Sequence, residues 1–275
     1  MLRVTALHIY PVKSCRGVAV PAATVDALGF VGDRRFLVVD SDGKFLTQRV
    51  QPRMALIETA LTADHLLLSS CDRGAICVPL QPGTQKPEPR TVTVWRDTVT
   101  AEDCGGEAAD WLSAFLGFRC RLVRAGAAYR RPLPDRKLPS TLDGRLATGH
   151  DVSFADAFPF MLLSEETLAD LNARLAAPLP MNRFRPSLVV AGGAPYGEDE
   201  WRRFRIGSVV FHGATRCGRC VVTTTNQTTA ERGQEPLRTL ATYRADAEGT
   251  VMFGRNLVHE TKAGRVAVGD AVELM

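Results

Sequence analysis

The sequence shows neither a membrane-spanning apolar segment nor the pattern of a secretory signal. No run of apolar residues approaches the roughly 20 that a helix needs to span a bilayer. The opening segment, MLRVTALHIYPVKSC, has no charged stretch followed by an apolar one, so no secretory signal is apparent. This segment has the pattern of a β-strand, and we expect no membrane partner.

Cysteine and histidine are arranged in ways that exclude several familiar sites. The seven cysteines are odd in number and spread from Cys15 to Cys220, which is not the pattern of a disulfide framework. The five histidines form no His-x-x-x-His pair, and there is no Gly-x-Ser-x-Gly elbow and no Walker loop. We therefore predict free thiols and a reducing, cytoplasmic compartment.

Lysine is scarce relative to arginine, and the basic residues form no nucleic-acid-binding pattern. The chain has five lysines against 29 arginines, and its net charge is +4. The basic residues are scattered rather than gathered in one block, and no groove-reading motif accompanies them. We predict no nucleic-acid partner.

The chain has a normal globular composition with many strand signals. Its 275 residues, 45% hydrophobic and 23% charged, suit one large domain or two ordinary ones. Short β-branched or apolar runs recur every 8–12 residues or so, which is typical of a sandwich or barrel, and an Asp-Gly turn at 41–44 indicates a hairpin. The predicted strands include residues 2–10, 34–40, 54–61, 65–70, 75–80, 91–95, 186–192, 204–213, 220–225, 251–260 and 264–274.

Helical patterns are few. Residues 105–117 carry apolar side chains at helical spacing and end with Gly117 at a C-cap position. Residues 164–175 begin with Ser164 as N-cap and have acidic residues in the first turn. Residues 235–244 place a proline at the first helical position. We interpret the apolar stripes of these segments as core packing.

A segment rich in proline, glycine and charge, residues 124–145, is the best candidate for a linker or long loop. It divides the chain into an N-terminal domain over 1–125 and a C-terminal domain over 126–275. Strand signals occur on both sides of it, so we expect both domains to be rich in β-structure.

The segment ATRCGRCVVTTTNQ contains Cys217 and Cys220 at Cys-x-x-Cys spacing. A structural zinc site needs four ligands, and the sequence has no second pair at zinc-finger spacing. A dithiol redox site usually begins a helix, whereas the β-branched run after Cys220 predicts a strand. A third interpretation needs one thiolate, favoured by Arg216 and Arg219, to bind a transition metal that arrives within a cofactor. The residues alone leave these three interpretations open.

Two other segments could hold an anion. In YPVKSCRG, Lys13 and Ser14 follow the first predicted strand and lie beside backbone N–H groups, which suits a phosphate. In NRFRPSLVV, Asn182, Arg183 and Arg185 precede a predicted strand, where an arginine can bind phosphate or carboxylate through two hydrogen bonds. The simpler explanation is a solvated turn for the first segment, and an arginine that caps the edge of a strand for the second.

Several segments together resemble one family, in the same order along the chain. They are IYPVKSCRGV, GDRRF, PFMLLSEETLADLNARL, NRFRPSLVV, CGRCVVTTTN, EPLRTLATYR and FGRNL followed by GRVAVGDAVEL. The chain resembles MOSC-domain proteins with an N-terminal MOSC-type β-barrel domain, and among them the mitochondrial amidoxime-reducing component and its bacterial relatives. The resemblance implies an α+β, mainly β fold, in which a MOSC-type β-barrel domain packs with an N-terminal MOSC-associated β-rich domain and helices are few.

The resemblance also implies a molybdenum enzyme that reduces N-hydroxylated compounds such as amidoximes and hydroxylamines. The implied cofactor is the molybdenum cofactor, a pterin dithiolene with a terminal phosphate, and Cys220 matches the family's metal-ligating and catalytic cysteine. Lys13 and Ser14 match the residues that bind the pterin phosphate. The other implied cofactor-binding residues are Arg34, Asn182, Arg185 and Thr223.

The resemblance implies two partners, a small N-hydroxylated substrate and a separate electron-transfer protein. The chain carries no four-cysteine iron–sulfur domain, so the electrons would come from a ferredoxin-like protein, a flavoprotein or a b-type cytochrome. MOSC domains also occur in cofactor sulfurases, which gives an alternative function as a sulfur carrier with a persulfide on Cys220. Pyridoxal phosphate binding belongs to this alternative, and sulfurases place it in a separate domain that the sequence does not contain.

The sequence departs from the family pattern at two places near the implied site. NQTTAERG follows the threonine run where the family often has Asp-Pro-Asp-Thr-Gly, and Ala157-Phe158 stands where animal relatives have Thr-Ser. Family contacts made by those residues therefore do not transfer to this chain.

Overall fold

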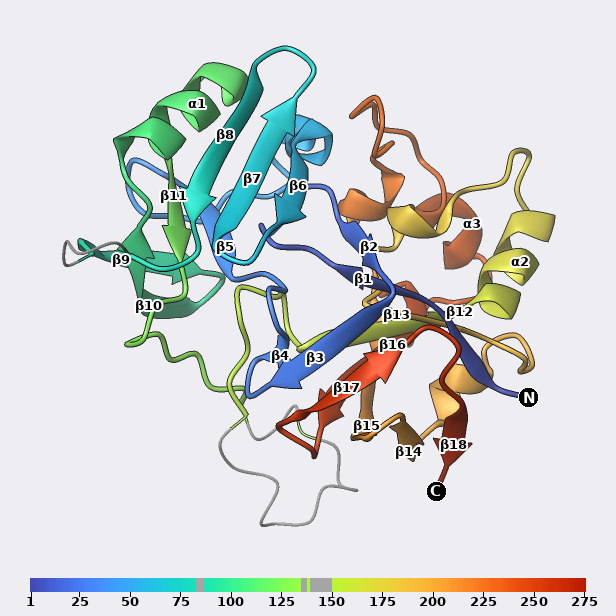
Figure 1. The fold of residues 1–275 in the computed structure, drawn as a ribbon. Helices are drawn as coiled ribbons and strands as arrows, with labels where there is room; N and C mark the ends of the chain where they lie inside the picture. Colours follow the sequence, from blue (N-terminus) through green and yellow to red (C-terminus); the bar gives the residue numbers. More distant parts are fainter. Residues whose placement is uncertain (83–86, 135–137, 139–149) are drawn as a thin grey trace.

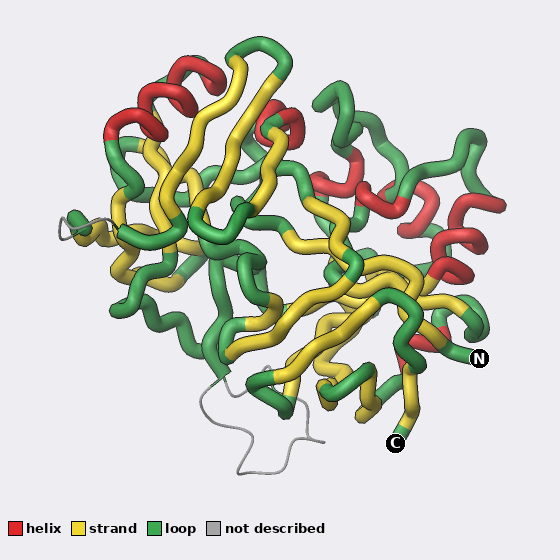
Figure 2. The backbone as a smooth tube through the Cα atoms, viewed as in Figure 1, coloured by secondary structure: helices red, strands yellow, loops and turns green. Residues whose placement is uncertain are grey.

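The computed structural model describes residues 1–82, 87–134, 138 and 150–275. Strands dominate these residues, which also contain three α-helices (Figure 1, Figure 2). The prediction of an α+β, mainly β fold with few helices is therefore confirmed. The sheets are open rather than closed into a complete barrel.

The largest sheet has eight strands in the order β18-β14-β15-β16-β12-β13-β1-β2. Its pairs are antiparallel except for β12 and β13, which run parallel. The N-terminal strand β1 therefore lies inside a sheet that is otherwise built mainly by the second half of the chain. The strands are β1 (Arg3–Ile9), β2 (Val18–Val20), β12 (Phe160–Ser164), β13 (Leu188–Ala191), β14 (Arg203–Ile206), β15 (Val209–Gly218), β16 (Met252–His259) and β18 (Val272–Leu274).

Three smaller sheets complete the described strands. Their orders are β5-β11-β10-β9, β17-β3-β4 and β6-β7-β8. The second of these again joins the two ends of the chain, because β3 pairs with β17. The strands are β3 (Ala22–Asp26), β4 (Gly29–Phe30), β5 (Phe36–Asp40), β6 (Glu58–Leu61), β7 (His65–Ser70), β8 (Gly74–Pro79), β9 (Pro89–Val94), β10 (Asp97–Asp103), β11 (Cys120–Arg124) and β17 (Gly264–Ala267).

The three predicted helices are present. Helix α1 (Gly106–Leu116) packs against β11 and ends at Gly117, whose φ of 85° is the left-handed conformation that glycine adopts easily. Helix α2 (Glu165–Ala173) begins after Ser164, whose hydroxyl accepts a hydrogen bond from the Thr167 amide. Helix α3 (Leu237–Ala241) follows Pro236. Single turns of 3-10 helix form at η1 (Pro52–Leu56), η3 (Met181–Arg183), η4 (Gly197–Glu200) and η5 (Val221–Thr224).

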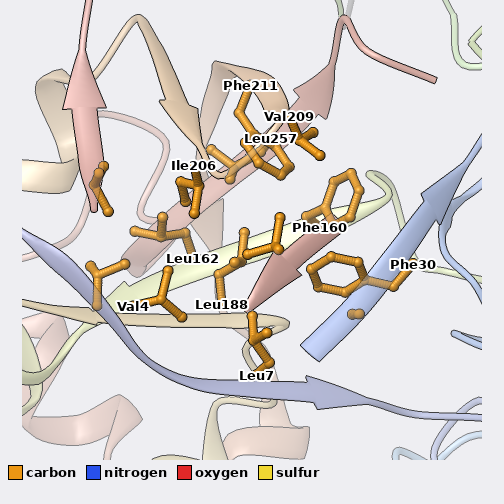
Figure 3. Close-up of a cluster of buried hydrophobic side chains, with 14 of the residues drawn as sticks. Val4, Leu7, Phe30, Phe160, Leu162, Leu188, Ile206, Val209, Phe211 and Leu257 are labelled. Carbon is orange, nitrogen blue, oxygen red and sulfur yellow. The ribbon is translucent and has the colours of Figure 1, made fainter. Parts of the chain in front are cut away.

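Three phenylalanine rings pack together in the core of the large sheet, beside aliphatic side chains such as Leu162 and Leu257 (Figure 3). The Phe160 ring packs edge-on against Phe30 and Phe211, with centroids 4.9 and 5.2 Å apart. These rings come from β12, β4 and β15, so the cluster joins strands from both ends of the chain. Such edge-to-face pairs stabilise a core beyond the area that they bury.

The hairpin predicted at 41–44 is present as a tight turn after β5. Val39 and Phe45 form an antiparallel bridge, and the Asp40 side chain accepts hydrogen bonds from the amides of Asp42 and Lys44. Gly43 has a φ of 77°, and a Cβ at this position would lie 2.7 Å from the Thr91 carbonyl oxygen. Glycine is therefore required here both for its conformation and for its size.

One predicted strand is wrong. Residues 220–225 do not extend as a strand; instead, β15 runs through Cys217 to Gly218, and a 3-10 turn follows Cys220. The hydroxyls of Thr223 and Thr224 donate hydrogen bonds to the carbonyl oxygens three residues earlier. These local hydrogen bonds outweigh the preference of β-branched residues for strands, which depends strongly on context.

The predicted linker, residues 124–145, falls only partly within the described residues. Arg124 still belongs to β11, and residues 125–134 form no helix or strand; Leu133 donates a backbone hydrogen bond to the His150 carbonyl oxygen. Most of the remainder lies outside the described residues, so the predicted division near residue 125 stays a prediction. None of the described helices has the length and hydrophobicity needed to cross a membrane.

Candidate functional site

A pocket of about 350 Å³ brings together segments from both halves of the chain. Its volume falls within the range of roughly 300–1,000 Å³ that is usual for small-molecule sites. Most of the predicted site residues line it. The lining residues are Lys13, Ser14, Arg34, Arg49, Ala155, Asp156, Ala157, Phe158, Phe160, Met161, Phe184, Arg185, Thr215, Arg216, Cys217, Gly218, Arg219, Cys220, Val222, Thr223 and Asn256.

Lys13 reaches the pocket from the loop after β1. Its backbone amide donates to the Phe36 carbonyl oxygen, and its Nζ donates to the Phe154 carbonyl oxygen at 2.6 Å and to Asp156 Oδ1 at 2.5 Å. The lysine side chain is 5% exposed. Burial lowers the pKa of Lys13 to about 8, with Asp156 acting in the opposite direction. The Asp156 carboxylate beside the ammonium favours its charged form.

The ring of Tyr10 supports two arginines of the pocket. The guanidinium of Arg34 lies 4.4 Å from the ring centroid and that of Arg185 lies 4.2 Å from it, which are cation–π distances. Burial raises the pKa of Tyr10 to about 12, so the phenol stays neutral, and its hydroxyl donates to the Pro186 carbonyl oxygen. A side chain at Gly17 would collide with this ring. The sequence analysis did not identify Tyr10, although it precedes the Lys13 motif directly.

Ser14, Arg34 and Arg185 share an unusual backbone conformation. Their φ angles are 67°, 48° and 55°, and the described residues contain only three other non-glycine residues with positive φ. Such conformations cost free energy and persist where the surrounding structure enforces them, often at binding sites. The surroundings here include the Asp33 carboxylate 2.5 Å from Arg34 Nη1 and the Cys15 carbonyl oxygen 2.7 Å from Arg185 Nη1.

The two cysteines of the Cys-x-x-Cys segment both line the pocket but have different surroundings. Cys217 is in β15, and its Sγ accepts a hydrogen bond from Nη1 of Arg219 at 3.0 Å. Cys220 precedes η5 as its N-cap, and its Sγ has no hydrogen-bond partner among the described residues. The chain's seven cysteines are all free thiols. Cys220 therefore presents a sulfur atom that no protein group uses.

The surroundings of Cys217 and Cys220 support neither a zinc site nor a dithiol redox site. A zinc site needs four ligands, and the described residues contain no group of three or more potential ligands close enough to share a metal ion. The turn after Cys220 is helical but only four residues long, whereas a dithiol site relies on the dipole of a true helix.

Two of the predicted cofactor-binding residues are placed differently from the others. Thr223 lines the pocket, but its hydroxyl donates to the Cys220 carbonyl oxygen at 2.9 Å, so this hydroxyl holds the cysteine turn. Asn182 lies in η3, is exposed and does not line the pocket. Arg49 and Asp156 do line it, and the sequence analysis did not identify either as a site residue.

A buried pair of amides joins the cysteine loop to the N-terminal half. Gln48 and Gln227 each donate from Nε2 to the other's Oε1 at 3.0 Å, and both side chains are almost fully buried. Gln48 also donates to the Ser14 carbonyl oxygen at 2.7 Å. The two segments that carry Cys220 and the Lys13 motif are thus held in one hydrogen-bond network.

We expect Gln48→Leu to lower the free energy of unfolding by about 1–3 kcal/mol, because it leaves the buried amide of Gln227 without its partner. Urea denaturation followed by circular dichroism measures this change. The double variant Gln48→Leu/Gln227→Leu should lose less than the sum of the two single variants. Strict additivity would show that the amide pair does not couple the two segments.

A second depression, of about 460 Å³, lies between the large sheet and α2. It is lined by residues such as His8, Leu168 and Val189, and it is wide open to solvent. None of the predicted site residues lines it, so the smaller, charged pocket is the candidate functional site.

Comparison with known proteins identifies the family of the chain. Residues 1–119 match the MOSC N-terminal beta barrel domain and residues 149–273 match the MOSC domain. The chain is 34% identical to mitochondrial amidoxime-reducing component 1 of Mus musculus and 32% identical to that of Homo sapiens, covering 99% of this chain and 82% of each relative. It is also 33% identical to a molybdenum cofactor sulfurase of Danio rerio, over 94% of this chain but 32% of the sulfurase. The chain therefore belongs to the MOSC-domain family, in the form in which a MOSC N-terminal β-barrel domain precedes the MOSC domain.

Proposed function

We propose that the protein is a molybdenum-cofactor-dependent oxidoreductase that reduces N-hydroxylated compounds such as amidoximes and hydroxylamines. The observation that carries the proposal is that one pocket contains both the unpartnered sulfur of Cys220 and a wall of cationic side chains. The names of the amidoxime-reducing relatives support the choice of substrate class.

The residues of the pocket fit a pterin dithiolene cofactor in two respects. A thiolate is a soft ligand suited to a metal that dithiolene sulfurs already hold, and Cys220 offers such a sulfur. Lys13 and several arginines offer the positive charge that a terminal phosphate requires. The guanidiniums of Arg34 and Arg185 both pack on the Tyr10 ring.

In this proposal the bound molybdenum cofactor supplies the two-electron chemistry at nitrogen, and the protein supplies position and charge. Cys220 holds the metal and Thr223 fixes the turn that carries it. Lys13, Ser14, Arg34 and Arg185 hold the phosphate and the pterin edge. The Asn182 side chain, exposed in η3, has no role that its position supports.

The reaction consumes two electrons and two protons and releases water, so it needs an electron donor. We propose a separate electron-transfer protein in a reducing, cytoplasmic compartment. Phe158, Phe160 and Met161 give one wall of the pocket an apolar character, which suits the organic part of a small substrate.

The test is to quantify molybdenum and pterin in the purified protein and to measure benzamidoxime reduction with an artificial electron donor. About one molybdenum per chain together with reduction of benzamidoxime is the expected result. Zinc as the bound metal, or molybdenum-loaded protein that leaves every N-hydroxylated compound unchanged, would overturn the proposal.

The similarity to a cofactor sulfurase supports a second candidate function, that of a sulfur carrier. In this function Cys220 would carry a persulfide. The half-buried Cys220 with its free Sγ is compatible with this role too. Mass spectrometry of protein purified without reductant separates the two, because a persulfide adds one sulfur atom to the Cys220 peptide.

A further inference from the structure

An exposed tryptophan ring lies beside the cationic pocket. Trp95 is 42% exposed, and the guanidinium of Arg49 lies 4.4 Å from its ring centroid. The ring also packs against Phe45, with centroids 4.9 Å apart, and Lys13 Nζ lies 5.8 Å from the Phe45 centroid. Arg49 and Lys13 both line the pocket. Trp95 is therefore joined to the pocket by two contacts while part of its ring faces solvent.

The backbone of Trp95 is unfavourable for a large side chain. Trp95 is the first residue of the two-residue loop between β9 and β10, where Val94 pairs with Asp97. Its φ is 59°, a conformation that such loops normally give to glycine or asparagine. A bulky residue with positive φ costs free energy. The turn itself therefore does not explain the tryptophan, and exposed aromatic rings of this kind often make the central contacts of protein interfaces.

Two further side chains lie beside Arg49 at the surface. Val50 follows Arg49 in the sequence and is 71% exposed. The Arg232 guanidinium donates to the carbonyl oxygens of Gln48 and Arg49, the latter at 2.7 Å. The rim face, as we call this surface at the edge of the pocket, consists of Arg49, Val50, Trp95, Arg96 and Arg232.

The rim face carries a net positive charge. Arg96 and Arg232 are exposed, and neither forms an ion pair within the described part of the chain. Asp97, which follows Arg96, is already paired with Arg131 at 2.8 Å. Glu231 is the acidic neighbour of Arg232 in the sequence. The arginines of the rim face therefore outnumber the unpaired acids beside it.

We propose that the rim face docks an acidic electron-transfer protein, which delivers its electrons to the redox centre of the pocket. This inference rests on the proposed function, in which the pocket holds the redox-active metal and a separate protein supplies the electrons. It adds the place on the chain where that protein binds and the sign of its charge.

The position of the rim face suits electron entry. The rate of electron transfer falls steeply with distance, so a donor must dock where the pocket reaches the surface. Arg49 belongs to both the pocket and the rim face. The loop after the Cys220 turn also reaches this face, because Thr225 and Arg232 form a backbone bridge. A donor on the rim face therefore lies beside the segment that carries the proposed metal ligand.

Charge decides between an acidic protein and a second copy of the chain. The chain has a net charge of +4, so two copies that meet through their rim faces would repel each other. An acidic carrier would instead be attracted, and this attraction would speed its association and weaken with salt. A small charged face with an aromatic centre also fits electron-transfer encounters, which usually bury less than about 1,200 Å².

The electrons balance with a one-electron carrier. For each benzamidoxime, two reduced carriers are oxidised and two protons are taken up from water. The N–O bond breaks, new N–H and O–H bonds form, and benzamidine and water leave. Each turnover thus requires two docking events, so the carrier must dissociate readily between them.

The probe is a plant-type [2Fe–2S] ferredoxin, an acidic one-electron carrier, and its binding to the full chain is measured by isothermal titration calorimetry. We expect the affinity to fall about tenfold or more between about 50 mM and about 300 mM salt. At the lower salt, Trp95→Gly and Arg96→Glu should each weaken binding by about tenfold or more. Glycine suits the conformation of residue 95, so the first variant should keep its hairpin.

Arg265→Glu is the matched control for charge. Arg265 is an exposed arginine of β17, in a different sheet from Trp95, and it forms no ion pair within the described residues (Figure 1). Its ferredoxin affinity should stay within about threefold of the unaltered protein, because its charge is not at the docking face. Absence of ferredoxin binding to the unaltered protein, or an equal loss in Arg265→Glu, would overturn the proposal. A dimer in gel filtration that Trp95→Gly dissociates would also overturn it, by showing that a second copy covers the face.

Benzamidoxime reduction with two donors separates docking from chemistry. With reduced methyl viologen, a small donor, activity per bound molybdenum should be unchanged in Trp95→Gly and Arg96→Glu. With reduced ferredoxin, kcat/KM should fall about tenfold in both variants. Equal losses with both donors would show that these residues serve the chemistry or the fold and would overturn the docking role. Molybdenum-loaded protein that reduces nothing with methyl viologen would refute the proposed function, while ferredoxin binding would still test the rim face.

Discussion

Replacing Cys220 by serine should abolish molybdenum-dependent reduction, whereas Cys217→Ser should retain most of it. The Sγ of Cys220 lines the pocket without a hydrogen-bond partner among the described residues, and the proposal makes it the metal ligand. Changes to residues that only support a metal ligand cost roughly 10–100-fold, so loss of the ligand itself should exceed about 100-fold in kcat. Benzamidoxime reduction by both variants, normalised to bound molybdenum, measures the difference.

Cys217→Ser serves as the matched control, since it removes a thiol from the same pocket three residues away. Its Sγ accepts a hydrogen bond from Arg219, and a serine oxygen can accept the same bond. We therefore expect its activity to stay within about threefold of the unaltered protein. Equal and complete loss in both variants would contradict the single-ligand assignment and favour a role for the dithiol.

Replacing Arg185 by alanine should lower the molybdenum content by about tenfold while activity per bound metal falls much less. The guanidinium of Arg185 lies in the pocket with its charge unpaired by any carboxylate in the described residues, so an anion of the cofactor is its natural partner. A charge-assisted hydrogen bond contributes about 1.5–3 kcal/mol, and the lower end of this range corresponds to about a tenfold loss of affinity. Metal analysis after gel filtration, together with activity per molybdenum, separates retention from turnover.

Arg174→Ala is the control for this variant. Arg174 also packs on a tyrosine, with its guanidinium 4.3 Å from the Tyr243 ring centroid, but it lies on the surface of α2, away from the pocket. Its molybdenum content should be unchanged. Arg185→Ala protein that is fully loaded with cofactor yet inactive would show that Arg185 acts in turnover and not in binding.

Much of the secondary structure follows from local sequence. Gly117 and Ser164 end and begin helices where their positions predict, because a C-cap glycine and an N-cap serine act within a single turn. The threonine run after Cys220 is the clear failure. Its strand propensity is real, but the hydroxyl hydrogen bonds of Thr223 and Thr224 back to the preceding carbonyls form only in the folded turn.

The pocket residues that belong to a family motif could be named from the sequence. Lys13, Ser14, Arg34, Arg185, Thr223 and Cys220 all line the pocket, although they are separated by up to 200 residues of sequence or so. Asn182 was named from its neighbours in the motif, but it lies exposed in η3, whereas Phe184 and Arg185, which follow η3, line the pocket.

The sequence by itself determined the family, the mainly β character and the residue types available for chemistry, since these depend on local patterns and on the order of motifs. The tertiary structure decided which groups meet. It places β1 within the sheet of the C-terminal half, stacks two arginines on Tyr10 and sets Asp156 against Lys13 from 143 residues away. No local pattern encodes such pairings, because long-range contacts arise only when the whole core packs and each buried charge must find a partner.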